Sequence, residues 1–237
     1  MLPPPRIRSL SVAGVALSGL LLLTGCLPAG ATAGATAASA GGVSPAPFSV
    51  AAARSAQGSL PVGSASYPMP GPGTCHARTQ IGQPLPDPSC TPGAVNPAVT
   101  PATIHETICA SGWTKTVRPP VSVTDRMKAQ SARSYGVPRA MRGEYDHLVP
   151  LELGGAPSDP RNLWFEPGHI PNPKDAVENK LNSAVCSGLV PLRTAQAAVA
   201  TDWVTAFDTS GLRVAGGRVC LRANPHRCVT DRHYGSN

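Results

Sequence analysis

This chain of 237 residues has seven cysteines, and the six that remain when Cys26 near the N-terminus is set aside place the strongest constraint on how it can fold. All six follow residue 73, and none of them forms a CxxC pair, which argues against structural zinc. An even number of cysteines in an exported chain is typical of disulfides, although sequence alone does not choose among the possible pairings. Proximity along the chain favours Cys75–Cys90 and Cys220–Cys228, which leaves Cys109–Cys186 to close a long loop.

The N-terminus predicts export. Arg6 and Arg8 precede an apolar run from Leu10 to Leu23 that is too short to span a bilayer and is typical of a signal peptide. The run ends in "LLTGC", which resembles the bacterial lipoprotein box. This resemblance implies a signal peptide at 1–25, a lipid on Cys26 and attachment to the outer face of the cell membrane. The alternative is an ordinary signal peptide and a secreted protein.

Charge and composition divide the rest of the chain. Without Arg6 and Arg8, 18 of the 20 basic residues remain against 13 acids, a formal charge of +5 that favours acidic partners. Residues 26–72, rich in Ala, Gly, Pro and Ser, predict a disordered tether. Residues 73–208 predict one disulfide-braced, mostly helical α+β domain, and residues 209–237 a basic tail.

Apolar periodicity and capping residues predict helices at about 100–109, 124–135, 173–187 and 194–207. Two short extended runs, "YDHLVPL" and "NLWF", flank "ELGGAPSDPR" and predict a hairpin with a wide loop. If the hairpin packs on the third helix, four polar residues would gather in one cleft: Asp146, His147, Asn162 and Asn172. Oxygen donors of this kind suit one Mg²⁺ or Mn²⁺ ion, and an adjacent imidazole can take a proton from water. Nothing in the sequence indicates an organic cofactor.

The segment "DHLVPLELGG…NLW" resembles the HNH endonuclease motif, and a wider likeness, from about residue 90 to residue 203, is to small exported HNH-like proteins of high-GC bacteria. The resemblance implies a ββα-metal fold and a nuclease that cuts DNA or RNA. It makes Asp146 a metal ligand, His147 the general base, and Asn162 the residue that fixes the loop and orients the histidine. The third family position falls on Asn172. Further candidates for this position or for support of the site are Glu178, Asp175, Lys174 and His169.

A basic run leads into the first strand of the predicted hairpin. It consists of Lys115, Arg118, Arg126, Lys128, Arg133, Arg139 and Arg142, with Asp125 as the one acid between residues 112 and 142. Contacts from such residues bind the phosphate backbone without reading bases, so we expect little sequence specificity. A solvated basic face is the alternative.

The site residues also have structural interpretations. Asn172 could simply cap the helix before Pro173. Lys174, Asp175 and Glu178 could form either a solvated helix face or an ion pair that braces the site. The alternative to a nuclease is therefore a non-catalytic surface lipoprotein that binds nucleic acid or an anionic wall polymer. That function is favoured if Asn172 points away from Asp146 and no other donor replaces it.

Overall fold

The structure, a computed structural model, describes residues 59–64 and 66–231. The predicted signal peptide, Cys26 and residues 26–58 of the tether lie outside these residues. Within the described part, no helix is long and apolar enough to cross a bilayer.

The folded domain begins earlier than the sequence predicts. Val62 forms a parallel bridge with Val95, and Arg161 donates a hydrogen bond to the carbonyl oxygen of Val62 at 2.8 Å. The assignment of all of 26–72 to a disordered tether is therefore wrong for its described residues, from 59 onward. Composition misses this segment because backbone hydrogen bonds, which any residue can make, hold it in place.

The first predicted helix is a single 3-10 turn, η1 (Ile104–Glu106). Thr103 Oγ1 donates to the carbonyl oxygen of Ala98, and Thr107 Oγ1 donates to that of Thr103. Hydroxyl bonds of this kind compete with helical hydrogen bonds. The threonines that suggested a helix cap thus stabilise a turn.

Two short strands and two helices complete the N-terminal half. β1 (Arg78–Gln80) pairs with β2 (Gln83–Leu85), and α1 (Trp113–Val117) precedes α2 (Val121–Ser134). The second predicted helix is confirmed as α2, which starts at Val121, directly after Pro120 and three residues before the predicted cap Thr124.

An antiparallel hairpin forms the centre of the domain. β3 (Gly143–His147) pairs with β4 (Leu163–Pro167), and the wide loop between them contains the 3-10 turn η2 (Leu151–Leu153). α3 (Lys174–Cys186) follows after a loop. The predicted order of strand, strand and helix is thus present.

The last predicted helix is broken in two. α4 (Leu192–Asp202) ends where the backbone of Asp202 becomes extended, with a φ of −164° and a side chain that accepts a hydrogen bond from the Val204 N–H. The 3-10 turn η3 (Trp203–Thr205) and the short helix α5 (Ala206–Thr209) follow.

The C-terminal residues are part of the fold. β5 (Leu212–Ala215), β6 (Arg218–Leu221) and β7 (Cys228–Thr230) form an antiparallel sheet, and Leu212 and Val219 are fully buried. The prediction of a loop-like tail from residue 209 is therefore wrong. Strands of three or four residues are too short to produce a clear alternating pattern in the sequence.

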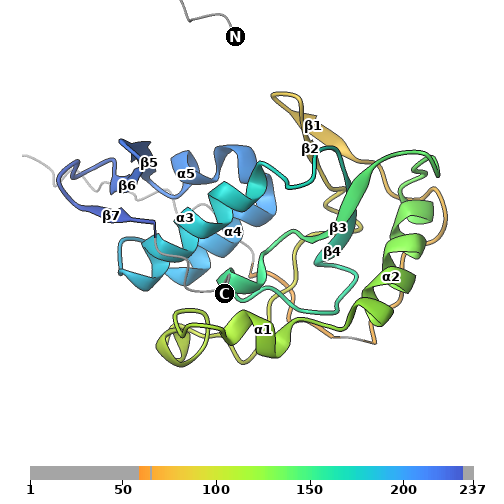
Figure 1. The fold of residues 1–237 in the computed structure, drawn as a ribbon, viewed down its shortest axis with the longest axis horizontal. Coiled ribbons are helices and arrows are strands. Elements are labelled where there is room, and N and C mark those ends of the chain that lie inside the picture. Colours follow the sequence, from red (N-terminus) through yellow and green to blue (C-terminus); the bar gives the residue numbers. More distant parts are fainter. Residues whose placement is uncertain (1–58, 65, 232–237) are drawn as a thin grey trace, which may run out of the picture. The chain divides into compact units, whose positions relative to one another are not determined.

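Two groups of elements surround the hairpin. In Figure 1, α2 lies beside β3 and β4, while α3, α4 and α5 gather with the C-terminal sheet. The main core forms in this second group and around the loop after β3, with Leu148, Leu181, Val199 and Trp203 among its buried residues. The domain is thus mixed α and β, and the expectation of a mostly helical domain is wrong.

All three predicted disulfides are confirmed. Their sequence separations are 15 residues for Cys75–Cys90, 77 for Cys109–Cys186 and 8 for Cys220–Cys228. The second bond joins the segment after η1 to the end of α3, so it braces the helix that follows the hairpin.

Removal of the Cys109–Cys186 bond should cost the most stability, because it closes the longest loop. Chain entropy gives a loss of about 4.5 kcal/mol for the variant with alanine at both positions. The matched control without Cys220–Cys228 should lose about 2.5 kcal/mol, since that loop spans only 8 residues. Urea unfolding of both variants beside the wild type measures the difference, and equal losses would contradict it.

Candidate active site at the hairpin–helix junction

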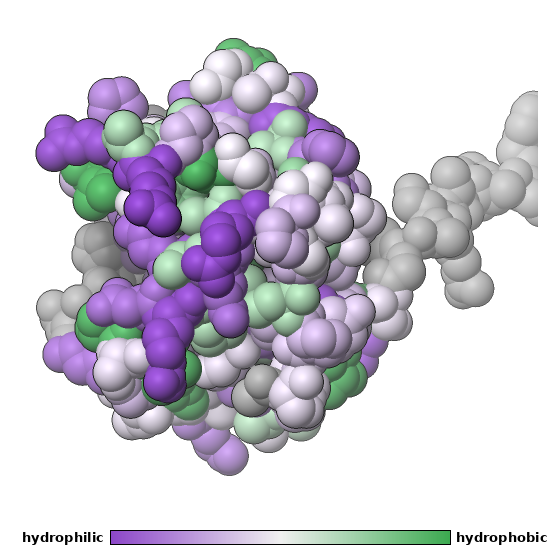
Figure 2. Space-filling view, turned by 90° about the vertical axis from the view of Figure 1, so that its right-hand side faces the viewer, coloured by the Kyte–Doolittle hydropathy of each residue, from purple (hydrophilic) through white to green (hydrophobic). Residues whose placement is uncertain are grey.

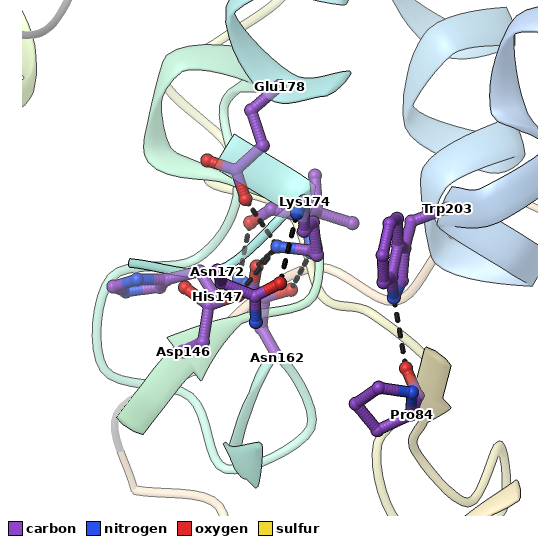
Figure 3. A network of polar contacts seen from close by, with 9 residues as sticks. Pro84, Asp146, His147, Asn162, Asn172, Lys174, Glu178 and Trp203 are labelled. Carbon is purple, nitrogen blue, oxygen red and sulfur yellow. Dashed lines mark hydrogen bonds and ion pairs between the residues drawn. The ribbon is translucent and has the colours of Figure 1, made fainter. Parts of the chain in front are cut away.

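The hairpin and α3 meet at a buried lysine. Lys174 is the first residue of α3 and is fully buried. Its ammonium group donates to Asp146 Oδ2 at 2.6 Å, to the carbonyl oxygen of His147 at 2.8 Å, and to Glu178 Oε1 (Figure 3). Because two of these acceptors belong to β3 and the third to the second turn of α3, one side chain joins the hairpin to the helix.

The charges at this junction centre on the pair of Asp146 and Lys174. Burial would raise the pKa of Asp146, but the Lys174 ammonium outweighs it and holds that pKa below its usual value. Burial would lower the pKa of Lys174, but Asp146, Glu178 and Glu166 raise it above its usual value. Burial raises the pKa of Glu178 to about 7 despite its contact with Lys174. Glu178 is therefore protonated part of the time near neutral pH.

Two further carboxyl groups lie on the hairpin. Glu144 on β3 stands directly opposite Glu166 on β4. Glu166 is buried, and its carboxyl group lies within hydrogen-bonding reach of Asn172 and Asp146. Burial raises the pKa of Glu166 to about 8, and burial with the charge of Asp146 also raises the pKa of Glu144. The junction thus holds more carboxyl groups than Lys174 alone can neutralise.

His147 projects away from this cluster. Successive side chains of a strand face opposite sides, and Figure 3 shows the imidazole directed away from Lys174. His147 Nε2 lies 3.0 Å from the carbonyl oxygen of Pro157. A carbonyl oxygen only accepts, so Nε2 carries the hydrogen, and Nδ1 has no hydrogen-bond partner among the described residues. Burial lowers the pKa of His147 to about 4, so the ring is neutral at pH 7 with a lone pair on Nδ1.

A pocket of about 220 Å³ opens beside the start of α3. It is lined by Thr114, Arg118, Leu151, Glu152, Asp175, Glu178 and Asn179. The positive charge of Arg118 also lowers the pKa of His147, which places the guanidinium within electrostatic reach of the imidazole. Burial, with the charge of Glu178 added, raises the pKa of Glu152 to about 8. The pocket thus holds two carboxyl groups that retain protons near neutral pH, while the neutral imidazole of His147 is not among its lining residues.

Asn162 holds the wide loop of the hairpin together. It is fully buried, its Oδ1 accepts from the Val149 N–H at 2.9 Å, and its Nδ2 donates to the carbonyl oxygens of Val149 and Ala156. A Cβ at Gly155 would lie 1.7 Å from the carbonyl oxygen of Val149 and 2.7 Å from Asn162 Nδ2. Asn162 and Gly155 are therefore both needed where the backbone at Gly155 comes close to the backbone of Val149. These hydrogen bonds agree with the loop-fixing role implied for Asn162. None of them goes to the His147 ring.

Asp146 and Asn172 do not form the predicted metal site in this arrangement. Lys174 occupies the position next to Asp146 Oδ2, and Asn172 Oδ1 accepts from the Lys174 backbone N–H at 2.9 Å, which is a capping contact. Among the described residues, no group of three or more His, Cys, Asp or Glu side chains is arranged to hold a metal ion. The residues as arranged do not fit a divalent cation, so no catalytic step is assigned to one here. Metal dependence stays a prediction.

The other predicted residues lie in different surroundings. His169 is exposed in the loop after β4 and lines a separate pocket with Met141 and Arg142.

Lys128, a member of the basic run, has a structural role, since its ammonium donates to the carbonyl oxygen of Gly143 at 2.9 Å and lies 5.5 Å from the centre of the Phe165 ring. The remaining basic residues of the run are exposed: Lys115, Arg118, Arg126, Arg133, Arg139 and Arg142. Figure 2, which faces the α2 side, shows hydrophilic side chains gathered on that surface.

Sequence reasoning missed Glu152 and Glu166 as members of the site. The two-residue spacing of Glu144 and Asp146 in a predicted strand could have indicated an acidic face, and the hairpin register then adds Glu166 to it. No comparable signal pointed to Glu152, because it lies in the irregular loop between the strands.

Comparisons with known proteins returned no relatives: no family model matches the chain, and neither the curated proteins nor the solved structures contain a match. The likeness to HNH endonucleases therefore rests on the residues of this chain alone.

Glu166 should make the protein less stable as the pH rises. Its folded pKa, about 8, lies above its unfolded value, so its contribution is complete below about pH 4.5 and is lost as the pH rises through 8. Between about pH 6.5 and about pH 9 this loss amounts to about 2 kcal/mol. His147 does not contribute in this range, because its effect is confined to pH values between its folded pKa of about 4 and its unfolded value.

The Glu166→Gln variant should lose less stability over the same pH range, because glutamine has no proton to release. Thermal unfolding at both pH values measures this, with Asp125→Asn on the exposed face of α2 as the control. An identical pH dependence in wild type and Glu166→Gln would show that Glu166 ionises normally in the folded protein.

Proposed function

We propose that this protein is a phosphodiester hydrolase that cuts nucleic acid outside the cytoplasm, with His147 as general base. The observation that carries the proposal is the state of the imidazole. The carbonyl oxygen of Pro157 holds the hydrogen on Nε2, and burial keeps the ring neutral with its Nδ1 lone pair available. A group in this state can take a proton from an attacking water molecule.

Two carboxyl groups supply the complementary acid. Glu152 and Glu178 line the pocket and have pKa values raised to about 8 and about 7. A carboxyl group that keeps its proton near neutral pH can donate it to the oxygen that leaves when a phosphodiester bond breaks. The opposite shifts of these groups and of His147 support a division into acid and base.

Arg118 is the best candidate for the phosphate contact. It lines the same pocket as both carboxyl groups and acts electrostatically on His147. A guanidinium group binds phosphate oxygens in a bidentate manner. The other exposed basic residues of α1, α2 and the loop after α2 would extend this contact along a backbone without reading bases. We therefore propose DNA or RNA as substrate, with little sequence specificity.

The three disulfides suggest an extracellular or otherwise oxidising environment. Together with the export signal, they support a site of action beyond the cell membrane. Attachment through a lipid on Cys26 is part of the proposal and rests on the likeness of "LLTGC" to the lipoprotein box.

One observation favours a second function. Asn172 caps α3 instead of facing an open position beside Asp146, and Lys174 fills that position. A scaffold in which an ion pair has replaced the reactive centre could bind nucleic acid or an anionic wall polymer without cleaving it. The state of His147 speaks for catalysis, and the following variant separates the two functions.

The His147→Ala variant should lose plasmid nicking by a factor of roughly 10² to 10⁴, the usual contribution of a general base. Retention on DNA should stay near the wild-type level, because the basic residues are unchanged. The exposed His105→Ala variant controls for loss of any imidazole. Nicking assays with Mg²⁺, with Mn²⁺ and with EDTA, together with gel shifts, measure both properties. Retention without any cleavage by the wild type would establish the binding function instead.

The pH dependence of cleavage should be bell-shaped. Activity should fall below about pH 4, where His147 gains a proton, and above about pH 7 to 8, where Glu178 and Glu152 lose theirs. Initial rates across this range measure the profile. The Glu152→Gln and Glu178→Gln variants should identify which carboxyl group sets the alkaline limb. A rate that keeps rising above pH 8 would exclude both as the acid.

A further inference from the structure

The ammonium group of Lys174 has the surroundings of a bound cation. All three of its N–H donors are used, each by an oxygen: Asp146 Oδ2, the carbonyl of His147 and Glu178 Oε1. The side chain has no exposed surface. Carboxylate and carbonyl oxygens from two separate elements are also the ligands that hard divalent cations take in proteins. Figure 3 shows these groups converging on the lysine from the hairpin and from α3.

Lys174 is held at its backbone as well as at its ammonium group. The Lys174 backbone N–H donates to Asn172 Oδ1, and the residue begins a helix directly after Pro173, whose φ is −56°. A lysine held at both ends cannot easily swing out to admit another ion.

The surrounding carboxyl groups require a positive charge at this point. Asp146, Glu178 and Glu166 all act electrostatically on Lys174, and Asp146 and Glu178 contact its ammonium group directly. Removal of one partner from a buried ion pair leaves an uncompensated charge, which is strongly destabilising. Without Lys174, the junction would leave two carboxyl groups and one backbone carbonyl around a vacated space.

We propose that Lys174 is a built-in cation that takes the place of a metal ion between the hairpin and α3. The wild-type junction then needs no divalent cation and binds none. Loss of the lysine side chain leaves the three oxygens that it contacts, Asp146 Oδ2, Glu178 Oε1 and the carbonyl of His147, open to a divalent cation. Lys174 is a positioning residue in this view, because it acts by holding Asp146, Glu178 and the backbone of His147. The proposal concerns the junction itself and does not depend on nuclease activity.

The test compares the full chain with its Lys174→Ala variant in EDTA and in Mn²⁺. The wild-type melting temperature should be the same in both solutions. The variant should melt roughly 10 °C lower in EDTA, because a buried charge pair is broken, and should recover at least half of that loss in Mn²⁺. Calorimetric titration should find one Mn²⁺ ion bound per variant chain and none bound at this junction in the wild type.

Two further variants locate the effect. Lys174→Ala combined with Asp146→Asn should no longer recover in Mn²⁺, because a ligand has been removed. Lys180→Ala is the matched control, since Lys180 lies on the same helix and pairs with Asp231 at 3.2 Å, away from this cluster. It should show no response to Mn²⁺.

Each outcome decides the proposal. A Lys174→Ala variant that folds only in Mn²⁺ supports it as strongly as one that folds in both solutions and recovers stability. A variant that is unfolded in both solutions, or that folds without binding Mn²⁺, overturns it. Mn²⁺ binding by the wild type that disappears in Asp146→Asn also overturns it. None of these measurements uses DNA cleavage, so an inactive wild type would contradict the proposed function and leave this result intact.

Discussion

The arrangement of the centre of this domain depends on one buried ammonium group. Lys174 joins β3 to α3 through a carboxylate, a backbone carbonyl and a second carboxyl group. Hydrophobic packing alone does not fix the angle between a two-stranded hairpin and a helix, because apolar contacts are non-directional. Three charge-assisted hydrogen bonds do fix it, and they explain why a lysine can stand at a fully buried position.

A second constraint, independent of charge, shapes the loop that carries the rest of the site. The amide of Asn162 bonds both backbone groups of Val149, and Gly155 leaves no room for a Cβ beside them. The carbonyl of Pro157, which sets the tautomer of His147, belongs to the same loop. The ion pair thus orients the strand that bears His147, while the amide orients the loop segment that holds the imidazole.

The sequence predicted best where local signals agree. The hairpin and α3 were predicted from spacing together with turn or capping residues, and the three disulfides from proximity along the chain. All were confirmed. Prediction failed where backbone pairing or tertiary contacts determine the structure of a segment. The strand contact of Val62 and the short sheet from residue 212 leave little trace in hydropathy. The place of Lys174 could be predicted only in part: an ion pair was one of two interpretations of the residues at the start of this helix, and only the folded structure shows that the lysine is buried.

The burial of the carboxyl groups also resolves a conflict of charge at the pocket. A polyanion would be repelled from a space lined by Glu152, Asp175 and Glu178 if all three were ionised. Burial keeps protons on Glu152 and Glu178 near neutral pH, which removes most of that repulsion. The positive charge of Arg118 then attracts the polyanion. The same desolvation that makes these groups costly to ionise therefore makes them suited to meet phosphate as proton donors. Polar burial at this junction costs stability, and acid–base chemistry on an anionic ligand is a physical reason to retain it.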